Sequence, residues 1–241
     1  MRYRYPKLNT EMPDRTDVLR LTPSAALPPL AEHMASLDLP SYLDRSDAQQ
    51  RLCSWGLDGT CCRRCLWGPC RVTISKPGIC GAGPAQVVMG NHLRMVAAAA
   101  AAHGSHARAR LETILAITEG REEGPLRGMD RVRWLAERLG VPQASAGADR
   151  PDLDVARDVA LVLYDDLSKA RPGPMRLLHA CAPPERVETW RELGVLPTST
   201  MAEVFESLHR TTLGTDSDWR NTALQELRLA VAFFWGAVAP A

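Results

Sequence analysis

The sequence is poor in aromatic residues and carries almost no net charge. Phe, Trp and Tyr make up 5% of its 241 residues, and 29 basic residues nearly balance 28 acidic ones, for a formal net charge of +1. Proteins that bind single-stranded nucleic acid use aromatic stacking surfaces, and binding to nucleic acid or to membrane surfaces in general draws on excess positive charge. The composition therefore indicates neither a nucleic-acid partner nor a membrane partner.

Long apolar segments are also missing. The N-terminus Met1-Arg-Tyr-Arg-Tyr-Pro has no apolar core of a secretory signal. The runs Met95–Ala102 and Leu229–Ala241 are both shorter than the ~20 residues that span a bilayer. No stretch shows the alternation typical of strands, and neither a G-x-G-x-x-G nor a G-x4-G-K-[ST] pattern is present. We expect a cytoplasmic protein that contains little or no sheet.

Helical periodicity runs through most of the chain. The longest pattern opens at Gly83-Pro84, with proline at the first helical position, where its missing N–H costs nothing, and ends near Gly120. Its alanine-rich centre favours helix and permits close packing of neighbours. Further amphipathic segments are predicted at Met129–Leu139, Asp154–Lys169, Pro184–Leu193, Met201–Thr212 and Trp219–Trp235. The fold class is therefore predicted to be all-α, a helical bundle with a cysteine-rich loop near the N-terminus.

The chain is expected to contain three segments. Residues 1–29 are polar and dotted with proline, which predicts a flexible lead-in. Residues 30–82 hold an N-terminal segment and the cysteine-rich loop, and residues 83–241 form the helical domain. We expect residues 30–241 to be one structural unit.

Cysteine is the unusual feature, because six of the seven cysteines lie between Cys53 and Cys80. Clustered thiols in an intracellular chain favour metal binding over disulfides. Four of them, Cys62, Cys65, Cys70 and Cys80, have the spacing C-x2-C-x4-C-x9-C. Such a set can hold either one [4Fe–4S] cluster or one tetrahedral zinc ion, and the glycines and prolines between them allow tight turns.

Cys53 and Cys61 remain outside that set. They supply two thiolates where a cluster requires four, and a two-fold axis would complete the set with the same pair from a second chain. The sequence therefore favours a homodimer, or a pairing with a related chain that offers the same two cysteines.

The order C-x7-C-C-x2-C-x4-C, followed by a further Cys-Gly, resembles the N-terminal segment of the nickel–iron carbon monoxide dehydrogenases of anaerobes. The resemblance extends over roughly residues 30–236, although the loop between Cys70 and Cys80 is shorter than is usual in that family. Outside the cysteines it is carried by Asp44-Arg45, Gln49-Gln50, Asn91-x-Leu93-Arg94-Met95, Ala101-Ala102-His103, Ala182-Pro183-Pro184-Glu185-Arg186 through Trp190, and His209-Arg210-Thr211.

The resemblance implies a role for each of the six cysteines. Cys53 and Cys61 correspond to the ligands of an iron–sulfur cluster shared across the homodimer axis. Cys62, Cys65, Cys70 and Cys80 correspond to the ligands of a [4Fe–4S] cluster inside each subunit. A ferredoxin-like electron partner is implied as well. Trp55 and Trp67, which flank the loop, are expected to pack over the metal site and exclude water.

Three histidines, His92, His103 and His106, share a face of the long helix at about 100° per residue. In the resembling family a ladder H-x2-H-x2-H-x2-H on this helix lies beside the catalytic nickel cluster and is thought to move protons. Here His103 and His106 match the first two rungs, whereas Ala109 and Glu112 stand at the others. The sequence leaves open whether the two histidines are a remnant of the proton relay or ordinary interface residues.

In the same family the ligands of the nickel site come from two α/β domains that follow the helical one. This sequence ends at Ala241, near the first domain boundary of the family, and Cys181 is its one cysteine beyond the loop. Cys181 is expected to be a small buried hydrophobe. One cysteine cannot hold a nickel–iron–sulfur cluster, so we expect a complete N-terminal module that binds no nickel and oxidises no CO by itself.

The function favoured by these residues is an iron–sulfur electron-transfer module of the dehydrogenase family, acting alone or as a split-off N-terminal part. Two alternatives use the same cysteines. One is a zinc-stapled structural or regulatory protein, and the other is a redox or gas sensor.

Overall fold

A computed structural model of the chain describes residues 24–41, 44–45, 48, 53–145, 148–212 and 215–240. The chain divides into two compact units, Met1–Ser54 and Trp55–Ala241. In the first unit, helix α2 (Leu27–Ser36) opens with proline in its first turn. Most of the expected lead-in lies outside the described residues, and the segment boundaries after residues 29 and 82 stay predictions.

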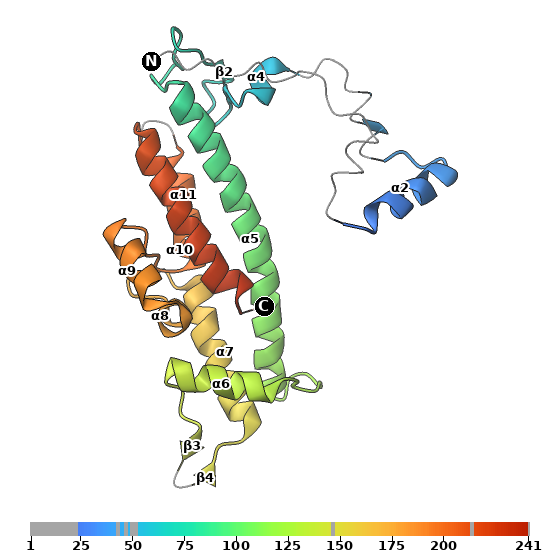
Figure 1. The fold of residues 1–241 in the computed structure, drawn as a ribbon, viewed down its shortest axis with the longest axis vertical. Helices are drawn as coiled ribbons and strands as arrows, with labels where there is room; N and C mark the ends of the chain where they lie inside the picture. The colour runs from blue at the N-terminus through green and yellow to red at the C-terminus, as the bar shows by residue number, and fades with distance from the viewer. Residues whose placement is uncertain are drawn as a thin grey trace. The chain divides into compact units, whose positions relative to one another are not determined.

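The second unit is built on one long helix, α5 (Pro84–Thr118), which has 35 residues. It packs against α7 (Asp152–Ser168), α10 (Thr200–Arg210) and α11 (Trp219–Phe233), as Figure 1 shows. Proline follows the N-cap Gly83, as the sequence predicted, because a helix tolerates proline in its first turn.

The alanine-rich centre of α5 lies where the helices meet. Ala97 and Ala100 are buried in a cluster with Leu93 and with Leu229 of α11. Further along α5, Leu111 belongs to a second and larger cluster with side chains of α6 and α7. Small side chains let helix axes approach closely, so the alanine run sets how near α11 lies to α5.

The shorter helices complete this unit. Helix α6 (Met129–Leu139) packs against α7 and α8 (Arg176–Cys181), and Gly140 ends it in the left-handed conformation. Helix α9 (Pro184–Glu192) places Val187 against Leu178 of α8 in a third apolar cluster.

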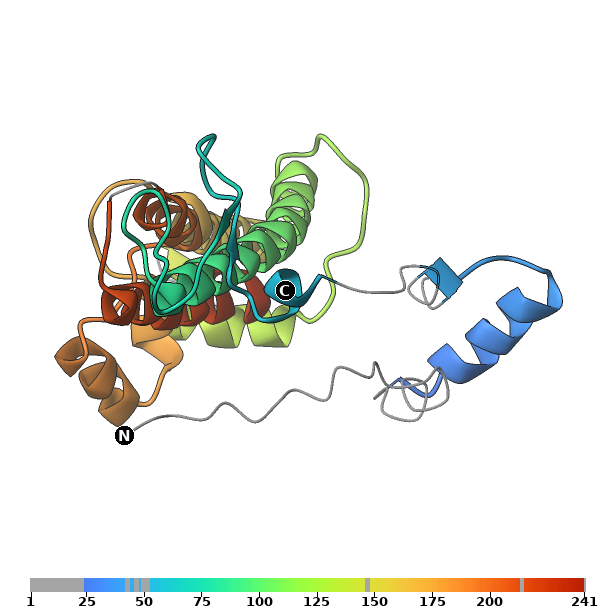
Figure 2. The ribbon, with the colours of Figure 1, turned by 90° about the horizontal axis from the view of Figure 1, so that it is seen from above.

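Sheet is limited to two short antiparallel hairpins in the described residues. Strand β1 (Cys61–Cys62) pairs with β2 (Cys70–Arg71), and β3 (Ala144–Ser145) pairs with β4 (Ala148–Asp149). The first hairpin and the short helix α4 (Ser54–Leu57) belong to the cysteine-rich segment, which lies at the N-terminal end of α5. Figure 2 looks down on that end and shows the segment over the helices.

The last turn of the bundle is a π-helix, η1 (Phe234–Val238), which continues α11. The Thr200 hydroxyl donates to the carbonyl of Ala232 at 2.8 Å, and a Cβ on the buried Gly236 would overlap that hydroxyl oxygen. A side chain that enters the ladder of backbone hydrogen bonds is a known cause of such distortions. Thr200 and Gly236 together therefore account for the π-turn.

The structure confirms the all-α fold class and the helical bundle. None of the helices in the described residues combines the length and apolar character needed to cross a bilayer.

Candidate metal centre

The β1–β2 hairpin sorts the cysteines onto two faces. Cys62 lies opposite Cys70 in the antiparallel register, and Cys61 lies opposite Arg71. Side chains alternate between the faces of a strand, and directly opposed residues have Cβ atoms about 4.5–5.5 Å apart. The pairing therefore brings Cys62 and Cys70 together on one face and leaves Cys61 on the other.

Cys65 and Cys80 join Cys62 and Cys70 in lining one hollow, which we call the cysteine hollow. Gly78 also lines it, and a Cβ at that position would lie only 3.8 Å from the Cβ of Cys70. Four thiols are the donor set that both an iron–sulfur cluster and structural zinc use, so the residues fit the expected group. Within the described residues, no three His, Cys, Asp or Glu side chains converge as ligands of a single metal ion.

Helix α5 is hydrogen-bonded to the cysteine-rich segment through its second turn. The Asn91 amide donates to the carbonyls of Gly59 and Cys61, both at 3.1 Å. The N–H of Val72 donates to the carbonyl of Thr60 at 3.0 Å, and the Val72 side chain is fully buried. The Asn91 contacts attach the segment around β1 to the second turn of α5, and the Val72 contact joins the residue after β2 to the residue before β1.

The far wall of the hollow comes from residues distant in sequence. Gln86, in the first turn of α5, is buried, and its amide donates to the carbonyl of Asp216 at 2.8 Å and to the Thr222 hydroxyl at 3.2 Å. Arg94 donates to the hydroxyl of Thr211 at 2.9 Å. Gln86, Thr211 and Asp216 all line the hollow, so α5 ties its wall to the segment between α10 and α11.

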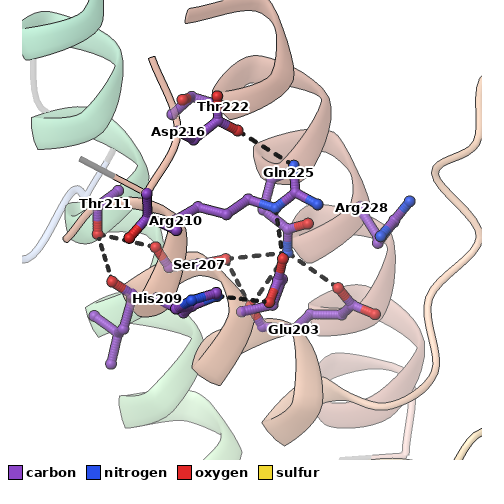
Figure 3. A network of polar contacts seen from close by, with 12 residues as sticks. Glu203, Ser207, His209, Arg210, Thr211, Asp216, Thr222, Gln225 and Arg228 are labelled. Carbon is purple, nitrogen blue, oxygen red and sulfur yellow. Dashed lines mark hydrogen bonds and ion pairs between the residues drawn. The ribbon is translucent and has the colours of Figure 1, made fainter. Parts of the chain in front are cut away.

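Behind this wall lies a buried polar network between α10 and α11 (Figure 3). The Gln225 amide donates to the Glu203 carboxylate at 3.0 Å and contacts the Ser207 hydroxyl at 3.3 Å. The second carboxylate oxygen of Glu203 accepts from the N–H of Thr198 at 3.0 Å. A buried carboxylate is stable only when its oxygens are satisfied, so these bonds fix how α10 and α11 pack.

Arg210 extends the network to the hollow. Its guanidinium contacts the Glu206 carboxylate at 2.7 Å and the Asp216 carboxylate at 3.4 Å. Burial raises the pKa of the Glu206 carboxyl, but hydrogen bonds from Arg210 and His209 outweigh it and hold that pKa below its usual value. Glu206 thus stays ionised and keeps Arg210 in position beside Asp216.

Arg64, between Cys62 and Cys65, is a cation that contacts a cysteine of the hollow. Its Nε lies 3.4 Å from the Sγ of Cys62, and its Nη2 donates to the carbonyl of Gln86 at 3.3 Å. Sequence reasoning missed this residue. The available signal was Gly90, because a glycine inside a helical pattern often marks a close approach by another group.

Several large apolar side chains of the cysteine-rich segment are exposed in the single chain. Leu66, Ile74 and Ile79 are among them, and Trp67 is 71% exposed. Trp67 therefore does not pack over the hollow, which corrects our expectation; Leu66 and Trp67 form a turn at the surface, where both side chains are exposed. Trp55 is half-buried, and Cys53 is exposed at the end of the first unit.

The histidines of α5 lie toward α11. His92 Nδ1 is 2.7 Å from the Glu226 carboxylate, and the His103 ring lies 5.5 Å from the ring of Phe233. His103 and His106 meet edge to face, with ring centroids 6.1 Å apart. Glu112, which stands where the family pattern has its fourth histidine, accepts a hydrogen bond from the Tyr164 hydroxyl at 3.1 Å.

Cys181 lies at the end of α8, far in sequence from the other cysteines. It is half-buried and packs against the largest apolar cluster. Burial raises the pKa of its thiol, and the charge of Arg138 opposes this only in part. A thiol that stays protonated is a poor ligand and a poor nucleophile, as expected of a packing residue.

Comparison with known proteins places this arrangement in a family. The profile of the Prismane/CO dehydrogenase family matches residues 60–241. Carbon monoxide dehydrogenase 1 of Methanosarcina acetivorans is 36% identical over 199 residues, which cover 80% of this chain and 31% of that protein. The chain thus spans about a third of the length of the curated relatives it matches.

Solved structures give the same result. A nickel-free carbon monoxide dehydrogenase from Thermococcus sp. AM4 superimposes with a TM-score of 0.81 at 34% identity, over 91% of this chain and 35% of that one. Carbon monoxide dehydrogenase IV from Carboxydothermus hydrogenoformans gives a TM-score of 0.79 at 34% identity, over 89% of this chain and 34% of that one.

Proposed function

The chain belongs to the Prismane/CO dehydrogenase family, and we propose that it is an iron–sulfur electron-transfer module of a nickel–iron carbon monoxide dehydrogenase. The observation that carries the proposal is the cysteine hollow, where Cys62, Cys65, Cys70 and Cys80 surround one space at the N-terminal end of α5. We propose these four residues as the ligands of an internal [4Fe–4S] cluster, which would accept and release single electrons there.

The chain's own residues suit such a cluster in three ways. The four thiolates are soft ligands of the kind that iron–sulfur clusters use. The buried side chain of Val87 lines the hollow and limits water there. The first turn of α5 faces the hollow, and the N-terminus of a helix carries a partial positive charge that stabilises a nearby anion.

Cys53 and Cys61 are proposed as ligands of a second iron–sulfur cluster, completed by the same pair from another copy or from a related dehydrogenase chain. The register of the hairpin supports this division, because it turns Cys61 away from the face of Cys62 and Cys70. Leu66 and Trp67 in the same segment are large apolar side chains that are exposed in the single chain, and a partner subunit could cover them.

We propose that the nickel site of the full enzyme draws its ligands from outside this sequence, since Cys181 is the sole cysteine here beyond the cysteine-rich segment. Electrons would then leave through a ferredoxin-like partner. His103 and His106, whose rings are in contact, are proposed as a remnant of a proton relay toward such a site.

Iron and acid-labile sulfide analysis of the anaerobically purified chain tests the proposal. Wild-type protein should be brown and lose visible absorbance on reduction, and Cys65→Ser should lose the iron of the internal site, roughly four atoms per chain. Cys181→Ser is the matched control and should keep the wild-type iron content. A colourless wild-type protein that contains zinc and no iron would contradict the proposal and favour a zinc-stapled structural or regulatory role.

A further inference from the structure

The Arg64 guanidinium bridges a cysteine of the hollow and the first turn of α5. Its Nε is 3.4 Å from the Sγ of Cys62, a normal distance for an N–H to sulfur hydrogen bond, and its Nη2 donates to the carbonyl of Gln86 at 3.3 Å. Two contacts from one planar group fix its orientation as well as its position. The side chain is only half-buried, but its charged end is held against the hollow.

Helix α5 has a slot for this guanidinium at Gly90. A Cβ added to Gly90 would overlap the Nη1 of Arg64 and would lie 2.7 Å from its Cζ. Glycine inside a helix costs about 0.5–1 kcal/mol relative to alanine, and Gly90 is buried one turn along from Gln86. The residue at this position therefore leaves room for a cation directly against the helix backbone.

Among the described residues, the polar contacts of Arg64 are with the Cys62 sulfur and the Gln86 carbonyl, and none is with a carboxylate. Asp216, the acidic residue that also lines the hollow, is instead in contact with Arg210 at 3.4 Å. The positive charge of Arg64 thus has the Cys62 sulfur as its nearest anionic partner once that cysteine is a ligand. Cysteine must be deprotonated to bind metal, so the contact becomes a charge-assisted hydrogen bond in the loaded protein.

We propose that Arg64, seated in the Gly90 slot, raises the reduction potential of the cluster held in the cysteine hollow. One-electron reduction adds one negative charge to the cluster and its thiolates without a proton, and a fixed cation beside a ligand sulfur stabilises that reduced form. Hydrogen bonds to ligand sulfurs and nearby charge are among the main protein determinants of cluster potential. This inference rests on the proposed function, because it requires an iron–sulfur cluster at this site.

The test is a redox titration followed by electron paramagnetic resonance, with dithionite as the reductant. It is carried out in the Cys53→Ser/Cys61→Ser background, so that the signal comes from the internal cluster. Arg64→Gln should shift the equilibrium toward the oxidised cluster at least tenfold, which is about 59 mV to lower potential for a one-electron couple. Arg63→Gln is the matched control, since it removes the same charge from the exposed neighbouring residue and should shift the equilibrium less than threefold.

Two further variants separate charge from position. Arg64→Lys keeps the charge, so its reduction potential should lie closer to that of the wild type than to that of Arg64→Gln. Gly90→Ala keeps Arg64 but fills its slot, and should lower the potential in the same direction as Arg64→Gln. Both remain informative if Arg64→Gln fails to assemble a cluster, because each keeps the cation.

Equal shifts for Arg64→Gln and Arg63→Gln would overturn the inference, since only net charge would then matter. An unchanged potential in Arg64→Gln, or in Gly90→Ala if Arg64→Gln holds no cluster, would overturn it as well. In each of these cases the wild-type chain still contains its cluster, so the proposed function stands. A wild-type chain without iron and sulfide would instead overturn both.

Discussion

Asn91 illustrates how one side chain joins the cysteine-rich segment to the helical bundle. Its amide nitrogen is the donor to two backbone carbonyls, those of Gly59 and Cys61, from a half-buried position on α5. A carbonyl that turns toward a helix loses water, so it needs a donor from the protein. These two bonds join α5 to β1, the strand whose register places Cys62 opposite Cys70.

Asn91→Ala should therefore destabilise the loaded protein by about 1–3 kcal/mol, because it leaves two carbonyls without their donor. Urea unfolding under anaerobic conditions measures the change, and retention of iron during unfolding reports the hollow itself. Asn221→Ala is the control at an exposed position of α11 and should change the stability by less than about 0.5 kcal/mol. Equal losses in both variants would show that the Asn91 contacts do not hold the segment.

Asp158 provides a pH-dependent prediction. A hydrogen bond from Arg150, at 2.8 Å, lowers the pKa of Asp158 below its ordinary value of 3.8, although burial acts in the opposite direction. A lowered pKa in the folded state means that the ionised carboxylate contributes stability above pH 3.8 and that this contribution is lost as pH falls through the lowered pKa.

Asp158→Asn should thus lower the stability by up to about 1 kcal/mol at neutral pH, as expected for a partly exposed ion pair. The difference in the free energy of unfolding between Asp158→Asn and the wild type should shrink as the pH falls below 3.8. Urea unfolding of both proteins as a function of pH measures it. A difference that stays constant into acid would mean that the carboxylate charge is not its source.

At this scale the sequence predicted the set of cysteines but not their surroundings. The spacing grouped Cys62, Cys65, Cys70 and Cys80, which the structure places around one hollow. Gln86 and its partner Asp216 are 130 positions apart, and no local pattern links them. Contacts of this kind depend on how α5 and α11 pack, so only the folded chain shows them.

Among the elements, the long helix was the most predictable. Proline in the first turn after Gly83 and the following periodicity gave the start of α5, and the bounds of α6 agree with the sequence pattern. Helix α8 was missed because its six residues are too few to show periodicity, and strands β1 and β2 are only two residues long. Such short elements are stabilised by tertiary contacts rather than by local propensity.

The π-turn at the end of α11 leads to a prediction about packing. Gly236→Ala places a methyl group where the Thr200 hydroxyl lies, so it should destabilise the protein by about 1–3 kcal/mol. Gly56→Ala is the control, because a Cβ there meets no atom within 4 Å. Thermal unfolding compares the two. A Gly236→Ala protein as stable as the control would show that the Thr200 hydroxyl can move aside without cost, and that its close approach to Gly236 does not fix the π-turn.

For the whole molecule, the cysteine-rich segment leads to a prediction about assembly. Cys53 and Cys61 offer two thiolates, and the apolar side chains of Leu66, Trp67 and Ile79 are exposed in the single chain. A two-fold axis that completes a shared cluster would also cover apolar surface of this kind. The sequence predicted a dimer from the ligand deficit alone, and the exposed apolar side chains are a further observation in favour of that prediction.

Replacement of both cysteines in Cys53→Ser/Cys61→Ser should remove the second cluster and weaken the dimer while the internal cluster remains. Sedimentation velocity of the anaerobic proteins measures the change in dimer strength. The concentrations should run from those at which the variant is dimeric to those at which it dissociates. Cys181→Ser should sediment as wild type does. A variant dimer of unchanged strength and unchanged iron content would show that helix packing alone holds the subunits and that no shared cluster exists.

Mössbauer spectroscopy of the anaerobic, iron-enriched chain tests the internal cluster most directly, because it counts iron sites by type. We predict the signature of an oxidised [4Fe–4S] cluster in the wild type and in Cys53→Ser/Cys61→Ser, and the loss of the internal cluster's share in Cys65→Ser. The contradicting result is a cluster that survives Cys65→Ser and disappears in Cys53→Ser/Cys61→Ser, which would place the iron outside the cysteine hollow.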